Sequence, residues 1–390
     1  MNLNMEMTKY KLGDLCKEFH SGKGILAAEI SDSGRYPVYG GNGLRGYTDR
    51  YNQDGSYLII GRQGAYCGNV RYNVGKAFLT EHAIVGQTKN EHNAIYLAFK
   101  LSLMNLAQFQ GQSAQPGLSV DTLSKIELLM PSRYEQDKIA KILVDLDDKI
   151  ALNKKMNQKL EAMAKRLYDY WFVQYDFPDK NGHPYKTTGG PMTYNPTLKR
   201  EIPAGWEVKS LFDCSDVLYG FPYATEPFDE ENLDASTKPY PVIRIRDIKD
   251  NTISAKTTEA VDDKYRTIVN DLLIGMDGYF HMSFWPRNDD YVNQRITRIR
   301  QKELSVMIIY HQIAPFIKFK EDQAKGSTVG HLSDKDMKQI NILVPNNPRL
   351  SEKFDSILNL ITKNKQEIYR LTKLRDKLLP LLMNGQVAVA

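Results

Sequence analysis

An internal repeat constrains this chain more than any other feature of its sequence. The segment 58–64, LIIGRQG, matches the segment 272–278, LLIGMDG, 214 positions further along. The same offset aligns five more residues with identical ones: Ser113, Leu118, Ser119, Ile126 and Pro131 with Ser327, Leu332, Ser333, Ile340 and Pro345. A register kept over roughly 70 residues of mixed types indicates two copies of one fold, not one large domain.

Two shorter matches extend the repeat upstream. RYPVYG at 35–40 resembles PYPVIR at 239–244, and KLGDL at 11–15 resembles EVKSL at 207–211. Their offsets are smaller, which predicts an insertion in the second copy around residues 221–237.

Each copy ends in a long helical pattern. Ser132 to Glu135 forms a capping box after Pro131, and Asn347-Pro348 supplies an N-cap and a first-turn proline for the second pattern. The apolar residues that follow keep heptad spacing: Ile139, Ile142, Leu146, Met156, Leu160, Met163, Leu167 and Tyr170, then Phe354, Ile357, Leu360, Leu371, Leu374, Leu378 and Leu381. The spacing predicts two helices of about 40 residues each.

These helices are expected to pack on each other, because at about 1.5 Å per residue they overreach an ordinary domain. Packing of each helix on its own domain is the alternative. Asn153 and Asn364 align between the two patterns, and a polar residue in such a seam fixes register and partner choice. The expected packing residues are Ile139, Ile142, Leu146, Asn153, Leu160, Leu167, Ile357, Asn364, Leu371 and Leu378.

The segments before the helices alternate short β-branched and aromatic runs with Gly and Asn turns, as in YLIIGRQGAYCGNVRYNVG. They predict α+β domains with twisted, loop-rich sheets. The expected organisation is a first domain over 1–131, a helix over 132–175, a second domain over 176–347 with an irregular connector at 176–206, and a final helix over 348–390.

The composition excludes several classes of protein. The net charge of +5 is mild for a chain that would hold a polyanion by itself. No run approaches the roughly 18 apolar residues of a membrane span, and no export signal is recognisable, so we expect a cytoplasmic protein. Cys16, Cys67 and Cys214 are isolated, which predicts buried thiols and neither a disulfide framework nor a zinc site.

Gly41, Gly43 and Gly46 have the spacing of a dinucleotide-binding loop. That site needs a helix after the glycines, but YTDRYNQDGSYLII has no helical periodicity. Two interpretations stay open. The glycines either bend a loop that carries Tyr39, Asn42, Arg45 and Tyr47 towards a large ligand, or they form a purely structural turn.

The sequence predicts no catalytic or metal site. Pro178-Asp179 with Glu207-Val208-Lys209 outlines a metal-dependent nuclease, but Asp179 lies in the connector and not on a strand. The seven histidines show no metal-ligand spacing. There is also no phosphate-loop lysine, and no Asn-Pro-Pro-aromatic tetrapeptide of the amino-methyltransferase kind.

Arg, Asn and Gln side chains on glycine-rich loops remain. Arg pairs with guanine, and Asn or Gln with adenine, in the major groove. The candidate DNA contacts are Arg35, Tyr39, Asn42, Arg45, Arg62, Gln63, Arg71, Arg244, Arg246, Asp277, Arg287, Asn293, Gln294 and Arg295. In QRITRIR at 294–300, strand alternation is expected to put arginines on one face.

Four stretches of the chain are distinctive: LEAMAKRLYDYWFVQYDFPDKNGHPYK at 160–186, REIPAGWEV at 200–208, GLSVDTLSKIELLMPS at 117–132 and LRDKLLPLLMNGQV at 374–387. In these stretches, and over essentially its whole length, the chain resembles the DNA specificity (S) subunits of Type I restriction-modification systems. The family has no catalytic residues to carry over, and its variable recognition positions do not transfer.

The resemblance implies two tandem target-recognition domains in pseudo-two-fold relation, joined by two antiparallel coiled-coil helices. Each domain would read one half of a bipartite DNA target, with the heads about one turn, or ~34 Å, apart. Two modification subunits would bind S-adenosylmethionine and flip an adenine in each half for N6 methylation. Restriction subunits, when present, would use ATP and Mg²⁺, and this chain itself would bind no cofactor.

Two rival functions stay open from the sequence. One is an enzyme, either a free-standing nuclease or the recognition half of a methyltransferase. The other is a coiled-coil adaptor that binds only protein.

Overall fold

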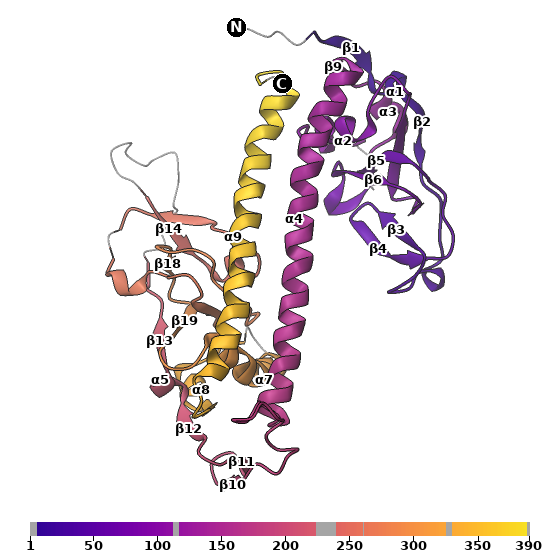
Figure 1. The fold of residues 1–390 in the computed structure, drawn as a ribbon. Helices are drawn as coiled ribbons and strands as arrows, with labels where there is room; N and C mark the ends of the chain where they lie inside the picture. Colours follow the sequence, from indigo (N-terminus) through magenta and orange to yellow (C-terminus); the bar gives the residue numbers. More distant parts are fainter. Residues whose placement is uncertain (1–5, 112–116, 224–238, 260, 325–329, 388–390) are drawn as a thin grey trace. The chain divides into compact units, whose positions relative to one another are not determined.

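The computed structural model describes residues 6–111, 117–223, 239–259, 261–324 and 330–387. The chain divides into two compact units. Unit 1 comprises Met1–Lys149 and Leu371–Ala390, and unit 2 comprises Ile150–Arg370. Each unit contains one sheet-rich domain and one stretch of each long helix (Figure 1).

Unit 1 contains three small sheets. One is the antiparallel pair β1 (Thr8–Lys11) and β9 (Glu127–Met130). The second is antiparallel, in the order β2 (Cys16–Ser21), β8 (Ala83–Thr88), β5 (Ser56–Gly61), β6 (Val70–Val74). The third has the order β4 (Gly43–Thr48), β3 (Tyr36–Gly40), β7 (Phe78–Leu79), with β3 and β7 parallel. The helices among them are α1 (Leu12–Leu15), α2 (Ala94–Ser102) and α3 (Val120–Ser124).

Unit 2 repeats this arrangement strand for strand. Its pair is β12 (Glu207–Ser210) and β20 (Asn341–Val344). Its larger sheet has the order β13 (Ser215–Tyr219), β19 (Ile296–Gln301), β16 (Leu272–Gly275), β17 (Met282–Phe284). Its third sheet has the order β15 (Ala255–Thr257), β14 (Tyr240–Ile243), β18 (Tyr291–Val292), again with one parallel pair. The matching helices are α5 (Leu211–Cys214), α7 (Val306–Ala324) and α8 (Asp334–Lys338).

Residues that the repeat aligns make the same hydrogen bonds in both copies. Ser119 caps α3 and Ser333 caps α8, and each hydroxyl accepts the backbone N–H three residues on, at 2.9 and 3.2 Å. The pair Ser113 and Ser327 lies outside the described residues. The duplicated α+β fold expected from the sequence is therefore confirmed.

One upstream alignment was wrong by three positions. The N–H of Leu12 donates to Ile126 at 2.8 Å, and the N–H of Leu211 donates to Ile340 at 3.0 Å, so these two leucines are equivalent. KLGDL therefore corresponds to SLFDC at 210–214, because both segments leave a strand and start a short helix with a buried leucine.

The inserted segments of the second copy are also more complex than the sequence suggested. The predicted insertion at 221–237 lies mostly outside the described residues. A second insertion, which sequence comparison missed, separates β14 from β15 and contains α6 (Ile245–Ile248). In unit 1 the equivalent strands β3 and β4 are joined by a tight turn.

The two long helices are α4 (Arg133–Tyr168), which ends in a π-helical turn at Asp169–Val173, and α9 (Arg349–Met383). Within unit 1, Arg375 of α9 pairs with Asp147 of α4 at 2.8 Å, and Met383 shares a core with Ile139. These contacts make the two helices antiparallel there (Figure 1).

Within unit 2 the same two helices are again antiparallel. Asn157 of α4 contacts Ile361 and Asn364 of α9, and further along α4 the rings of Trp171 and Phe172 meet Phe354, each with centroids 5.9 Å apart. The helix-on-helix arrangement is thus confirmed in each unit.

The buried stripe of α4 differs from half of the predicted series. Buried residues recur every seven positions: Leu143, Ile150, Asn157, Ala164 and Trp171. The predicted series instead named the residue one position earlier in four of these five places. The predicted Met156, Met163 and Tyr170 are 42%, 47% and 39% exposed. One residue turns a helix by about 100°, so this error moves a side chain out of the seam. Leu360 and Leu374 of α9 are likewise exposed.

The residues named for helix packing fall into two groups. Ile139, Asn153, Ile357 and Leu371 are buried. The other six are half-buried: Ile142, Leu146, Leu160, Leu167, Asn364 and Leu378. Ile142 lies one position off the buried stripe and packs at the edge of the unit 1 core.

The connector at 176–206 was predicted to be irregular, but it contains a hairpin of two strands, β10 (Met192–Asn195) and β11 (Arg200–Pro203). Aromatic stacking orders it, because Phe177 lies between Trp206 and Tyr185 with ring centroids 4.8 and 4.6 Å apart. Asp179, the carboxylate of the nuclease outline, accepts the N–H groups of Asn181 and His183 and caps a loop.

Two smaller predictions concern cysteines and membranes. Cys16 and Cys214 are buried, and burial raises their thiol pKa to about 12 and about 11. Cys67 is only half-buried, so it is not the buried thiol predicted. Of the helices in the described ranges, none is both long and apolar enough to cross a membrane.

Candidate DNA-recognition surfaces

The glycine-rich motif forms the β3–β4 hairpin. Gly43 has φ +97° and begins a strand, so no helix N-terminus follows the glycines to hold a pyrophosphate. Gly46 has φ +146°, and a Cβ there would lie 2.6 Å from Ile30 Cγ2 and 2.7 Å from the Ser31 carbonyl oxygen. Both glycines are therefore needed by the backbone of the hairpin.

Two exposed arginines flank this turn. A Cβ on Gly43 would lie 2.7 Å from Arg71 Nη1, and one on Gly40 would lie 2.8 Å from Arg45 Cδ. Arg71 also donates to the Asn42 carbonyl oxygen at 3.4 Å. The structure thus brings Asn42, Arg45 and Arg71 together at one hairpin.

Two further candidates lie on β3 or next to it. Tyr39 is half-buried, and burial and the neighbouring Tyr47 raise its pKa while Arg71 lowers it. Arg35 is exposed and lies over the Tyr36 ring, 5.3 Å from its centroid, at the other end of β3. Arg35 is therefore apart from the group at the turn.

The loop after β5 carries Arg62 and Gln63. The Arg62 backbone accepts from Leu118 and donates to the His82 carbonyl, both at 2.9 Å, and Gln63 forms an isolated bridge with Gly117. Both side chains are half-buried. The segment before α3 therefore fixes the base of this loop.

Unit 2 has the same bridge with different side chains. Asp277 pairs with His331, and its carboxylate lies 2.6 Å from His331 Nδ1 and 3.2 Å from Arg295 Nε. His331 and Arg295 are each about half exposed, whereas Asp277 is 26% exposed. Asp277 is thus shared by two basic side chains. His331 was missed, although it lies at the repeat position of Gly117.

Arg244 and Arg246 belong to the second insertion. The Nε atoms of both approach Ser254 Oγ, at 3.3 and 3.1 Å. The buried carboxylate of Asp247 accepts the Arg244 N–H and the Ser254 hydroxyl, each at 2.9 Å. This network orders a local turn and leaves Arg246 exposed.

Arg287 is used inside the fold. Its side chain is 16% exposed, pairs with the buried Asp290 at 2.9 Å and lies over Trp285, 4.6 Å from the ring centroid. Burial raises the pKa of Asp290, and the charge of Arg287 opposes that shift. A guanidinium held in this way has little freedom to meet a base, so Arg287 is not part of the candidate surface.

The arginines of QRITRIR do not form an outward-facing row either. Arg298 and Arg300 alternate along β19 as expected and share one partner, the buried Asp271, at 3.9 and 2.8 Å. Arg298 is only 2% exposed. Contacts with Asp271 therefore hold this face against the fold, and Arg295, just before the strand, is the most exposed of the three arginines, at 54% compared with 26% for Arg300.

Asn293 and Gln294 precede that strand. The Asn293 side chain accepts the Arg295 N–H at 3.3 Å, and the Gln294 N–H donates to the Phe221 carbonyl at 2.9 Å. Gln294 is exposed and Asn293 is half-buried. Asn293 therefore shapes the turn that presents Gln294 and Arg295.

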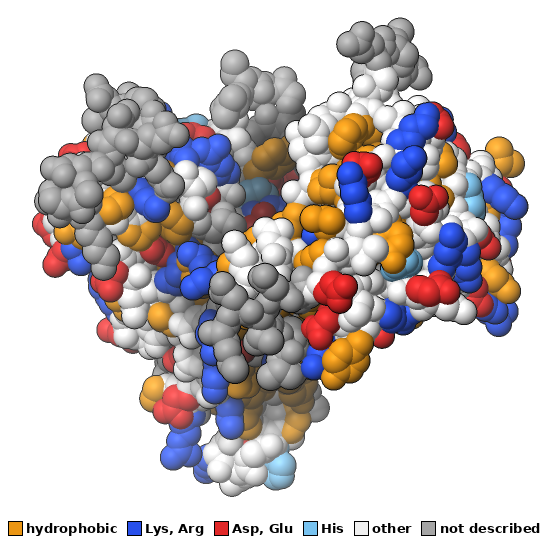
Figure 2. Space-filling model, turned by 90° about the horizontal axis from the view of Figure 1, so that it is seen from above, with side chains coloured by type: hydrophobic (Ala, Val, Ile, Leu, Met, Phe, Trp, Pro, Cys, Tyr) orange, Lys and Arg blue, Asp and Glu red, His pale blue; other side chains and the backbone are white. Residues whose placement is uncertain are grey.

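The charge on the surface is mixed. Figure 2 shows that, among the described residues seen in this view, Lys and Arg side chains are interspersed with Asp and Glu. Such a surface supplies few of the phosphate contacts that dominate affinity for DNA.

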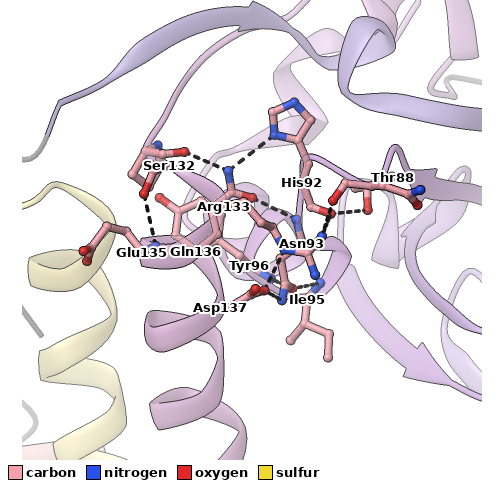
Figure 3. A network of polar contacts seen from close by, with 12 residues as sticks. Thr88, His92, Asn93, Ile95, Tyr96, Ser132, Arg133, Glu135, Gln136 and Asp137 are labelled. Carbon is pink, nitrogen blue, oxygen red and sulfur yellow. Dashed lines mark hydrogen bonds and ion pairs between the residues drawn. The ribbon is translucent and has the colours of Figure 1, made fainter.

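A polar network joins the sheet-rich domain of unit 1 to α4 (Figure 3). The fully buried amide of Gln136 accepts the Asn93 N–H at 2.8 Å and donates to the Pro131 carbonyl at 2.8 Å and to His92 Nδ1 at 3.3 Å. Asn93 caps α2, and its side-chain amide donates to Asp137 at 2.7 Å. Gln136 thus ties the start of α2 to the first turn of the long helix.

The predicted N-caps of the long helices also lie at these junctions. Ser132 accepts the Glu135 N–H at 3.3 Å, and Asn347 accepts the Arg349 N–H at 3.1 Å. In unit 2 the N–H of Ser305, just before α7, donates to Ser351 of α9 at 3.4 Å. The repeat therefore extends to how each domain is attached to its long helix.

A cavity of about 490 Å³ in unit 2 lies among α4, α7, α9 and β17. Lys365 lies in its wall and donates to Ser283 Oγ at 3.0 Å and to the Phe284 carbonyl at 3.1 Å, and burial lowers its pKa to about 8. Burial also lowers the pKa of His311 to about 4. Within the described residues no group of three or more His, Cys, Asp or Glu side chains is placed to hold a metal ion.

Comparison with known proteins agrees with this geometry. Residues 4–162 and 203–373 match the Type I restriction modification DNA specificity domain, so the chain carries this domain twice. It belongs to the family of Type I restriction-modification specificity subunits, and the two matched segments are its two recognition domains.

Individual relatives span different shares of the chain. The specificity subunit of the Type I restriction enzyme EcoprrI from Escherichia coli is 41% identical over 147 residues, which is 37% of this chain and 36% of that protein. The MjaIX specificity subunit from Methanocaldococcus jannaschii is 28% identical and covers 76% of this chain and 69% of its own length. The crystal structure of a Type I S subunit from M. genitalium aligns with a TM-score of 0.65 at 18% identity, over 98% and 97% of the two chains.

Proposed function

We propose that this chain is the non-catalytic DNA-reading and assembly subunit of a Type I modification and restriction complex. Each recognition domain reads one half of a bipartite DNA target. The observation that carries this proposal is the duplicated domain, which has the same strand order in both copies and a corresponding attachment to a long helix.

Base reading is assigned to two loop regions in each unit, of which the loop after β5 and the loop after β16 are equivalent. In unit 1 these are the β3–β4 hairpin and the loop after β5, with Tyr39, Asn42, Arg45, Gln63 and Arg71. In unit 2 they are the loop after β16 and the turn before β19, with Asp277, Gln294 and Arg295. Arginine pairs with guanine and amides pair with adenine, so the two copies are suited to different bases.

The long helices set the number of unread bases between the two halves and dock two methyltransferase subunits. Those partners bind S-adenosylmethionine and flip an adenine in each half-site. Restriction subunits, when present, add ATP- and Mg²⁺-dependent cleavage. The small net charge of +5 fits this division of work, because the partners then supply much of the phosphate binding. We place the complex in the cytoplasm.

The test is a map of N6-methyladenine in DNA exposed to the purified chain with its methyltransferase partner and S-adenosylmethionine. The proposal expects one bipartite motif with a fixed gap and no methylation without the partner. Turnover by the chain alone, with Mg²⁺ or with S-adenosylmethionine, would contradict it in favour of an enzyme. Absence of a DNA footprint from the assembled complex would favour a protein-only adaptor.

A further inference from the structure

The loop that joins β16 to β17 in unit 2 holds an aromatic surface in solvent. Tyr279 is 69% exposed and stacks on His281, with ring centroids 5.7 Å apart and planes 14° apart. The loop is closed by the Gly275 N–H, which donates to the His281 carbonyl at 3.0 Å. The tyrosine is therefore carried on a short, hydrogen-bonded turn.

Backbone contacts on both sides hold this turn. Gly278 has φ +71°, and a Cβ there would meet nothing within 4 Å, so backbone conformation and not packing favours glycine. The Gly278 N–H donates to Gly330 at 3.0 Å, and Asp277 bridges to His331. Tyr279 is thus two residues from the carboxylate that holds Arg295 and His331.

Unit 1 places a tyrosine in the equivalent loop between β5 and β6. Tyr66 is 49% exposed, and the nearby Gly64 has φ +75° with open space around a Cβ. The carbonyl oxygen of Tyr66 lies 2.3 Å from a Cβ built on Gly61, the last residue of β5. In unit 2 the Tyr279 carbonyl is the corresponding neighbour of Gly275, at 3.2 Å. The two tyrosines therefore occupy matching places, although their distances from the loop glycine differ by one residue.

The chemistry of an exposed ring limits what it can bind on DNA. Paired bases offer only their edges in the grooves, and an aromatic ring can stack on a base only where the base stack is opened. Base flipping opens it, because the extruded adenine leaves a gap and frees one face of its neighbours. The proposed function supplies one such gap in each half-site, and the structure places one exposed tyrosine in the equivalent loop of each domain, Tyr66 after β5 and Tyr279 after β16.

We propose that Tyr279 and Tyr66 stack in the gap left by the flipped adenine, one tyrosine in each half-site. This inference rests on the proposed function. It assigns the specificity chain a part in holding the flipped state, in addition to reading bases. The His281 ring stacks on Tyr279 and holds the orientation of the tyrosine ring.

The test uses the complex with methyltransferase partners and two forms of target DNA. One form carries 2-aminopurine, whose fluorescence rises on flipping, at one target adenine, and the other keeps both adenines so that the methylation rate can be measured. Tyr279→Ala should lower the flipped fraction and the methylation rate by roughly 5- to 150-fold, the range for loss of one base–aromatic stack. The loss should fall in the half-site read by the second domain, and Tyr66→Ala should give the reciprocal pattern. Tyr279→Phe should behave as the wild type.

Tyr194→Ala is the matched control, because Tyr194 is 62% exposed but lies on β10 of the connector hairpin. Unchanged flipping in Tyr279→Ala would overturn the inference. A defect in Tyr279→Phe equal to that of alanine would also overturn it, since the hydroxyl and not the ring would then make the contact. If the wild-type complex methylates no bipartite site, the proposed function fails; if it does and the alanine variants match it, only this inference fails.

Discussion

Replacing Gln136 with leucine should loosen the attachment of the first recognition domain to α4. The buried amide makes two hydrogen bonds of 2.8 Å, to the Asn93 N–H and the Pro131 carbonyl, and leucine of similar size makes neither. Leaving a buried N–H or C=O unpaired costs about 1–3 kcal/mol per group. With part of that recovered by the apolar side chain, the free energy of unfolding of unit 1 should fall by about 2–4 kcal/mol.

Hydrogen exchange of the intact chain, followed by mass spectrometry, is the appropriate assay, because a two-unit chain need not unfold in one step. Amides of α2 and of the first turns of α4 should exchange about 30- to 700-fold faster, the equivalent of that free energy. Gln158→Leu, an exposed site on the same helix, is the control. Exchange within about threefold of the wild type in Gln136→Leu would refute the claim that this network anchors the domain.

Three further predictions concern the helices and the cavity. Leu371→Lys should lower the free energy of unfolding of unit 1 by about 2–4 kcal/mol in urea unfolding, because Leu371 is buried. Leu374→Lys, at a 44% exposed site, should change that free energy by less than about 0.5 kcal/mol. Equal effects would mean that Leu371 does not lie in the helix-packing surface. Asn157→Leu alone should destabilise unit 2, because it leaves the buried side of the Asn364 amide without its partner. The double change with Asn364→Leu should recover most of the loss; additive losses would contradict the pairing. Burial lowers the pKa of His311 from 6.5 in the unfolded chain to about 4, so the folded state favours the neutral ring. Unit 2 should therefore keep its full stability above pH 6.5 and lose about 3 kcal/mol of it as the pH falls towards 4. His311→Phe should flatten that part of the stability profile, and an unchanged slope would contradict the assignment to His311.

Much of the fold was predictable, because a repeat leaves identical residues at identical offsets. Ser119 and Ser333 were found in this way, and both cap short helices. The seam of α4 was predicted only in part, since methionine and tyrosine at 156, 163 and 170 look apolar enough for a core but are exposed. Asn157 and Ala164, which do lie in the stripe, carry no hydrophobic signal.

The candidate surface was harder to predict than the fold. Neighbouring arginines differ in exposure, because exposure depends on which acids the fold places beside them. Asp290 holds Arg287 inside, and Asp216 and Asp271 hold Arg298, whereas Arg295 remains half exposed. Tyr66 and Tyr279 were missed for a related reason. Only the structure shows that both rings are exposed at the same loop of each copy.

The central claim is that the chain contains two independent readers of one DNA target. The most direct measurement replaces residues 1–131 with those of another specificity subunit and maps N6-methyladenine in DNA modified by the assembled complex. The account predicts that one half of the methylated motif changes while the other half and the gap remain the same. Changes in both halves, or a gap that moves with the exchanged domain, would contradict it.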